Sequence, residues 1–169
     1  MVKPSVSFRV HTIKANSWGT MKSLLAGSLA HVVLAQKRRL ITKDEIDQAS
    51  FLCTRRGWKS IWAPPNPTVA RGSSGGLAIL IRSWAACNTV DQTMAYPDRC
   101  VMCEAQMSGA YPIVVAPAYC VHPAGLDDEQ IRTLARLGGQ PPSGRQPWLR
   151  GADFNCEPGE LEHHSIAVL

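Results

Sequence analysis

The stretch Gly151-Ala152-Asp153-Phe154-Asn155 decides the fold, because it places two polar side chains directly after a short apolar run. The run is Pro147-Trp148-Leu149, and a turn-like Cys156-Glu157-Pro158-Gly159 follows. Residues two apart on a strand project from the same side, so Asp153 and Asn155 present a carboxylate and an amide together. Sheets of α/β folds bind ligands at strand ends, where such a pair suits orienting a water and holding a phosphate oxygen. Asp and Asn are also common β-turn residues, so a plain turn is the alternative.

Four upstream segments give the motif a wider context. Gly-x-Asp-Phe-Asn resembles the Gly-Asp-Phe-Asn motif of the endonuclease/exonuclease/phosphatase superfamily, which has the deoxyribonuclease I-like fold. Ala152 replaces the usual Gly, which is expected to crowd the turn. The upstream segments keep the order of the family's landmarks. Asn16 matches the Asn of the family's first strand, and residues 30–37 resemble its second strand. Residues 74–80 resemble the strand that begins with glycines, and residues 113–119 resemble the strand that ends in a tyrosine, here Tyr119. The nearest resemblance is to the endonuclease domains of non-LTR retrotransposons.

The resemblance implies a fold and a chemistry. The fold is α+β, a four-layer α/β/β/α sandwich, formed here by a single domain over residues 1–169. The chemistry is Mg²⁺-dependent phosphodiester hydrolysis of the endonuclease type. In that reaction Asp153 would orient or deprotonate the attacking water, Asn155 and Asn16 would hold the phosphate, and Tyr119 would hydrogen-bond it.

The departures from the family pattern concern the metal and the end of the chain. The family's metal-binding Glu corresponds to Lys37, whereas Mg²⁺ prefers oxygen ligands, often one or two carboxylates. Glu104 and Glu157 are candidate substitutes, and we favour neither. The family also ends in a Ser-Asp-His strand, but this chain ends at Leu169, and His163-His164 lacks the Ser-Asp lead and is expected at an exposed helix end. We therefore expect the last strands to be missing and hydrolysis to be weak or absent, which leaves enzymatic activity open.

The charge distribution suggests a non-enzymatic alternative, a nucleic-acid-binding remnant of a retroelement. Residues 1–124 carry 14 basic and 6 acidic side chains, for a net charge of +8, and residues 125–169 carry 4 basic and 7 acidic, for −3. The densest basic segments are Lys37-Arg38-Arg39 and Arg55-Arg56. A basic surface of this kind attracts a phosphate backbone without recognising the base sequence. Arg38 and Arg39 are therefore candidate substrate-binding residues. DNA is the favoured partner, and an ordinary solvated surface is the bland alternative.

A serine hydrolase is a rival enzymatic interpretation. Gly72-Ser73-Ser74-Gly75-Gly76 matches G-x-S-x-G, and Asp153 and His163 follow in a permitted order. The nucleophile elbow of that class needs a strand before the serine and a helix after it. Here a proline-rich segment precedes and an apolar strand pattern follows, so the context is reversed and disfavours this class.

Composition and cysteine usage limit the compartment. An apolar content of 45% and a charged fraction of 18% are typical of a globular domain. No segment approaches the ~18 consecutive apolar residues of a membrane span, and the N-terminus lacks the apolar run of a secretory signal. A cytoplasmic or nuclear protein without membrane contact is therefore expected. The six cysteines are expected to be reduced thiols, as is usual in a cytoplasmic or nuclear protein. Cys100 and Cys103 would point to opposite faces of one strand, so they are not expected to share a metal ion.

The hydropathy pattern predicts strands interspersed with helices. A capping box at Thr42-Lys43-Asp44-Glu45 opens a helix that stops near Gly57. Thr20 is predicted to cap a shorter helix with Met21, Leu24 and Leu25 on one face. Strands are predicted over residues 6–13, 31–35, 58–63, 76–82, 100–107, 111–119 and up to 153, a loop over 64–74, and a helix over 127–137.

Overall fold

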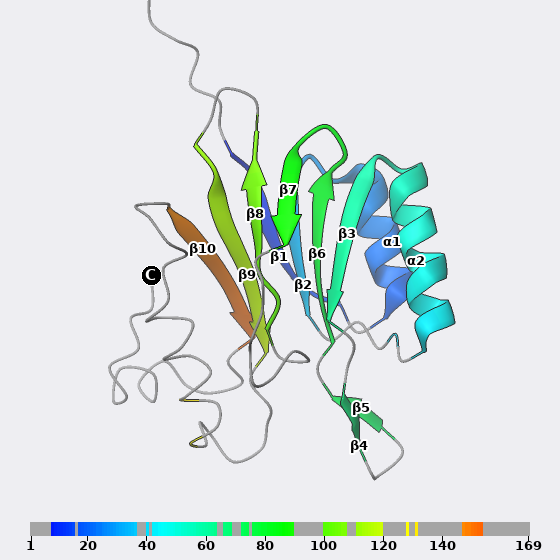
Figure 1. Ribbon diagram of the computed structural model, residues 1–169. Coiled ribbons are helices and arrows are strands. Elements are labelled where there is room, and N and C mark those ends of the chain that lie inside the picture. The colour runs from blue at the N-terminus through cyan, green and yellow to red at the C-terminus, as the bar shows by residue number, and fades with distance from the viewer. Residues whose placement is uncertain are drawn as a thin grey trace, which may run out of the picture.

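The computed structural model describes residues 8–15, 17–36, 40, 42–63, 66–68, 72–74, 76–89, 100–107, 111–119, 128, 131 and 147–153. Within these ranges the chain forms two four-stranded sheets, a small hairpin and two helices (Figure 1). Neither helix is long and apolar enough to cross a membrane. The predicted helix over residues 127–137 lies almost wholly outside the described residues.

The first sheet has the strand order β1-β2-β6-β3, with β1 and β2 parallel and β6 antiparallel to both its neighbours. Its strands are β1 (Val10–Lys14), β2 (Val32–Gln36), β3 (Trp58–Ala63) and β6 (Leu77–Arg82). Every residue of β2 is buried, as expected for an apolar strand that is covered on both faces. The predicted strands over residues 31–35, 58–63 and 76–82 are confirmed. The first strand starts at Val10 instead of Val6, and residues 1–7 lie outside the described ranges.

The second sheet has the order β10-β9-β8-β7, with β10 and β9 parallel. Its strands are β7 (Ala86–Thr89), β8 (Cys103–Gln106), β9 (Ile113–Tyr119) and β10 (Trp148–Asp153). The predicted antiparallel pair and the strand ending at Asp153 are confirmed. The polar, mostly exposed β7 was not predicted. The segment predicted as a loop contains a hairpin of β4 (Asn66–Thr68) and β5 (Gly72–Ser74), so that prediction was wrong.

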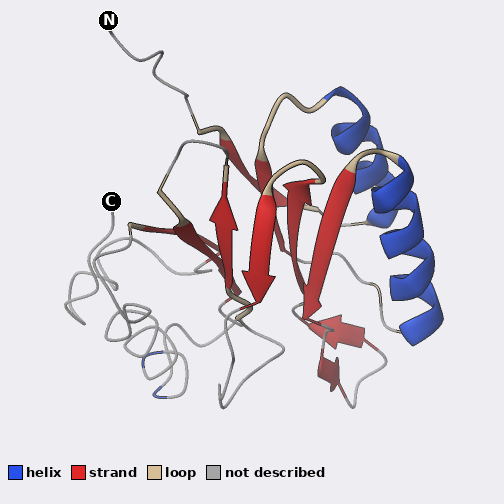
Figure 2. Ribbon diagram, turned by 45° about the horizontal axis from the view of Figure 1, so that its top comes forward, coloured by secondary structure: helices blue, strands red, loops and turns tan. Residues whose placement is uncertain are grey.

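Two apolar clusters hold three layers together. One lies between the sheets, where Leu34, Leu77 and Ile79 of the first sheet pack with Cys103 and Val115 of the second. The other lies on the opposite face of the first sheet, which both helices cover (Figure 2). A helix/sheet/sheet arrangement follows from these clusters, and the fourth, helical layer expected from the sequence lies outside the described residues.

Helix α1 (Trp18–Gly27) starts earlier than predicted. Ser17 is the N-cap, and its Oγ accepts a hydrogen bond from the Thr20 backbone N–H at 3.2 Å. The predicted Thr20 cap was therefore wrong, because Thr20 supplies the donor and Ser17 the acceptor. Met21 and Leu25 are buried as predicted, whereas Leu24, predicted on the same face, is 44% exposed.

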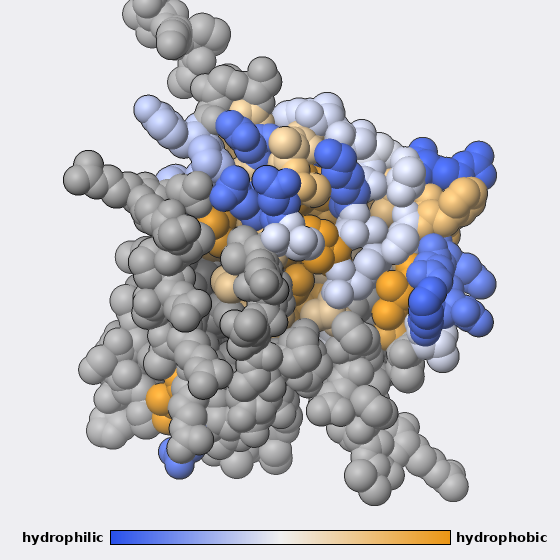
Figure 3. Space-filling view, in the orientation of Figure 1, coloured by the Kyte–Doolittle hydropathy of each residue, from blue (hydrophilic) through white to orange (hydrophobic). Residues whose placement is uncertain are grey.

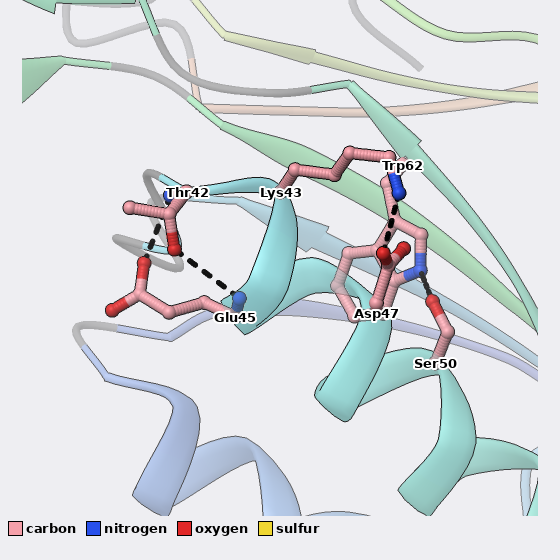
Figure 4. A network of polar contacts seen from close by, with 6 residues as sticks. All are labelled: Thr42, Lys43, Glu45, Asp47, Ser50 and Trp62. Atoms are coloured by element: carbon pink, nitrogen blue, oxygen red, sulfur yellow. Dashed lines mark hydrogen bonds and ion pairs between the residues drawn. The ribbon is translucent and has the colours of Figure 1, made fainter.

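Helix α2 (Lys43–Arg55) has the predicted capping box. The Thr42 hydroxyl accepts from the Glu45 backbone N–H at 3.2 Å, and the Glu45 carboxylate accepts from the Thr42 backbone N–H at 3.0 Å (Figure 4). The indole N–H of Trp62 on β3 donates to the Ser50 hydroxyl at 2.6 Å and so fixes the helix against the sheet. Gly57 follows with a φ of 76°, which a glycine adopts without strain. On the face that Figure 3 shows, the helices at the right carry hydrophilic side chains with apolar ones between them.

Thr42→Ala should lower the free energy of unfolding by about 1 kcal/mol, because it removes a helix N-cap acceptor. Urea denaturation measures the change. Thr54→Ala in the last turn of α2 is the matched control, since the Thr54 hydroxyl only donates to the Ser50 carbonyl within the helix. Equal losses in the two variants would contradict a special role for the cap.

The described cysteines are reduced thiols that form no disulfide. Cys53, Cys100 and Cys103 are buried and Cys87 is half-buried, whereas Cys120 and Cys156 lie outside the described residues. Burial, with smaller contributions from the neighbouring Cys87 and Glu104, raises the pKa of Cys103 from 9.0 to about 12. The Cys103 thiol is therefore protonated, and unreactive as a nucleophile, at neutral pH.

The raised pKa makes stability depend on pH. Between pH 9 and 12 the unfolded chain loses the Cys103 proton while the folded chain keeps it, so stability falls as pH rises through this window. From pH 8 to pH 10, urea denaturation should show a loss about 1 kcal/mol larger in the native chain than in Cys103→Ala. Identical losses would mean that the Cys103 thiol is not desolvated in the folded state.

Candidate functional site

The ends of two parallel strand pairs lie at one end of the molecule, the lower end in Figure 1. In the first sheet, Lys14 at the end of β1 pairs with Gln36 at the end of β2. In the second sheet, Asp153 at the end of β10 pairs with Tyr119 at the end of β9. We call this end, defined by Lys14, Gln36, Tyr119 and Asp153, the strand-tip site.

Gln36 joins the two sheets at the strand-tip site. Its side chain is 1% exposed, and among the described residues it is the one buried polar side chain. Its Nε2 donates a hydrogen bond to the Gly151 carbonyl at 3.0 Å, across the space between β2 and β10. Its backbone carbonyl accepts from the Ala15 N–H at 3.0 Å, which extends the pairing past the end of β1. A buried amide without a partner is costly, so this bond fixes how the two sheets meet.

Gly151 allows this close approach. A Cβ at Gly151 would lie 2.5 Å from the Thr12 hydroxyl oxygen and 3.0 Å from Leu34 Cδ1, which is closer than packed atoms tolerate. The crowding was predicted at Ala152 in a turn, and that prediction was wrong. Ala152 pairs with Ala118 inside β10, so the backbone is extended there, and the need for glycine falls one residue earlier.

The sequence-predicted site residues divide into two groups. Asp153 and Tyr119 are the paired last residues of β10 and β9, as their strand patterns predicted. The other predicted residues lie outside the described residues: Asn16, Lys37, Arg38, Arg39 and Asn155. Their described neighbours in the chain, Ala15, Gln36 and Asp153, lie at the strand-tip site. The structural role of Gln36 was not predicted, although a lone amide ending an otherwise apolar strand was visible in the sequence.

The described residues do not fit a magnesium site. They contain no group of three acidic, histidine or cysteine side chains placed to hold a metal ion. Glu104, one candidate substitute carboxylate, pairs with Val114, which is five residues from Tyr119 and so about 16 Å from the strand-tip site along β9. Position 37, where the family resemblance places the metal ligand, carries a lysine.

Comparison with known proteins identifies the fold. No family model matches the chain, and no curated protein does. Solved structures do match, among them the catalytic domain of human Nocturnin with a bound sulfate anion, at 16% identity and a TM-score of 0.64, covering 93% of this chain and 67% of that one. The endonuclease domain of the telomere-specific non-LTR retrotransposon TRAS1 matches at 13% identity and a TM-score of 0.60, covering 94% of this chain and 71% of that one.

A third match carries the superfamily name. It is an endonuclease/exonuclease/phosphatase family protein from Bacteroides thetaiotaomicron, at 11% identity and a TM-score of 0.61, covering 96% of this chain and 67% of that one. The chain therefore has the endonuclease/exonuclease/phosphatase fold, as the sequence predicted, and it spans about two thirds of the length of these neighbours.

Gly151→Ala should destabilise the protein by about 1–3 kcal/mol, because the new methyl overpacks the contact with Thr12 and Leu34. Thermal and urea denaturation measure the loss. Adding Thr12→Ala should restore most of it, since both close Thr12 atoms are then removed. Gly27→Ala at the end of α1 is the control, because a Cβ there has no neighbour within 4 Å. If Gly151→Ala unfolds like the native chain, the sheets do not meet at Gly151.

Proposed function

We propose that this chain is a phosphodiester-recognising domain in which Mg²⁺-dependent hydrolysis is weak or absent. The Gln36 Nε2 to Gly151 carbonyl bond carries the proposal. It ties the end of β2, which Lys37 follows, to the strand that ends in Asp153. A lysine in the position of the metal-binding Glu replaces an anionic ligand with a cation, which disfavours Mg²⁺ at this point.

The remaining groups suit binding and orientation. In this proposal Asp153 orients a water or accepts its proton, and the Tyr119 hydroxyl donates a hydrogen bond to a phosphate oxygen. The amides of Asn16 and Asn155 hold further phosphate oxygens. These four groups supply no Lewis acid to stabilise charge on a leaving oxygen, and losing one such stabilising group typically costs about 10²–10³ in rate.

Nucleic-acid binding without catalysis is the second candidate function. The observation that favours it is Lys14, whose exposed side chain lies at the end of β1 beside Gln36, with Lys37-Arg38-Arg39 next in the chain after Gln36. Basic residues at these positions favour binding to a phosphate backbone. The similar TRAS1 structure is an endonuclease domain, which makes DNA the favoured partner.

Nicking of supercoiled plasmid in Mg²⁺ or in EDTA tests the proposed function. The native chain should nick the plasmid only at the background rate. Lys37→Glu should raise Mg²⁺-dependent nicking by about a hundredfold or more, because it restores the carboxylate, and Asp153→Ala in the same chain should abolish the gain.

Lys43→Glu is the matched control, because it makes the same charge change at an exposed lysine in the first turn of α2. It should stay at background. If the native chain nicks the plasmid as fast as Lys37→Glu does, the proposal of weak activity is refuted. If no variant nicks the plasmid above background, the proposed hydrolase mechanism is refuted and nucleic-acid binding remains as the candidate function.

A further inference from the structure

The end of the first sheet opposite the strand-tip site has a surface of its own. It consists of residues 8–9, 28–31, 56–59 and 82–85, which we call the distal surface. Backbone bonds join its segments: the His31 N–H donates to the Arg9 carbonyl at 2.8 Å, and the Ser83 N–H donates to the Gly57 carbonyl at 2.9 Å. It lies where β2 and β3 begin and β6 ends, at the upper end in Figure 1.

An exposed aromatic side chain is held in place on the distal surface. Trp84 is 60% exposed, yet its ring meets the His31 ring edge-on, at 5.5 Å between centroids and 73°. The Phe8 ring also contacts His31, at 6.3 Å between centroids, and the Arg9 backbone N–H donates to His31 Nδ1 at 3.2 Å. Leu29 beside them is 71% exposed. Trp84 therefore offers a positioned aromatic face to solvent.

The charge of the distal surface has one sign. Arg9, Arg56 and Lys59 are exposed, and these four segments contain no aspartate or glutamate. The Lys59 ammonium donates to the Ala85 carbonyl at 2.7 Å, which places it one residue from Trp84. Arg82 is different, because its guanidinium lies 4.0 Å over the Trp58 ring and donates to the Ala30 carbonyl, so it holds the surface together.

We propose that the distal surface binds single-stranded nucleic acid, with a base stacked on Trp84 and phosphates held by Arg9, Arg56 and Lys59. Bases stack on exposed aromatic side chains without regard to sequence, and cations beside them bind the backbone. The positive charge that these four segments carry around an exposed indole complements a polyanion that carries aromatic groups. The distal surface shares no residue with the strand-tip site, so this inference stands apart from the proposed function.

Fluorescence anisotropy with a labelled 12-nucleotide oligothymidylate at low salt tests the proposal. Trp84→Ala should weaken binding about tenfold, in line with the effect of removing one stacking partner. Trp84→Phe should keep most of the affinity. The slope of log affinity against log salt should be about −2 for three phosphate contacts, and Arg9→Ala combined with Lys59→Ala should make it shallower.

Phe51→Ala is the matched control, because Phe51 is 63% exposed on α2, outside the distal surface. It should bind like the native chain, and unfolding midpoints establish that each variant is folded. Unchanged binding by Trp84→Ala, or a loss confined to Arg38→Ala combined with Arg39→Ala, overturns the proposal and leaves the proposed function standing. Stronger binding to polyglutamate than to the oligonucleotide overturns it in favour of an acidic protein partner.

Discussion

The hydrogen bond from Gln36 Nε2 to the Gly151 carbonyl is the constraint on which the strand-tip site depends. Apolar contacts between the sheets are non-directional and tolerate sliding, whereas a buried amide accepts only one placement of its partner. The missing side chain at Gly151 brings the partner carbonyl close enough. One polar group and one absent methyl thereby set the register between the two sheets, and with it the relative positions of the strand ends.

Part of the fold was predictable because its central strands, β2 and β6, are buried on both faces. Largely apolar runs such as residues 32–36 and 77–82 are typical of buried strands. The Thr42 to Glu45 capping box marks the start of a helix with two reciprocal hydrogen bonds. The errors came where local signals compete. Thr20 and Ser17 are both good N-cap residues, and the sequence does not decide between them. The hairpin of β4 and β5 depends on backbone pairing in a segment whose prolines and glycines suggested a loop.

The site was predictable to the level of strand ends and no further. Asp153 and Tyr119 lie side by side because each closes a recognisable strand, and strand parity can be read from the sequence. The contact between Gly151 and Thr12 could not be predicted, because it joins residues far apart in the chain across two sheets. The same holds for the distal surface, because its four segments lie far apart in the chain and only the fold brings Arg9, Arg56 and Lys59 to one end of the first sheet.

The parallel pairing of β9 with β10 has a consequence for the order of folding. Parallel neighbours need a crossover connection, so β10 docks only after a long segment has closed on itself. Gln36 and Gly151 are 115 residues apart, and contacts of such separation form late, because the entropy of closing the loop must be met before they contribute. On the ribosome, the first sheet and its helices emerge well before Gly151 does. Until β10 pairs with β9, the Gln36 amide is in contact with water, and the strand-tip site forms only when β10 docks.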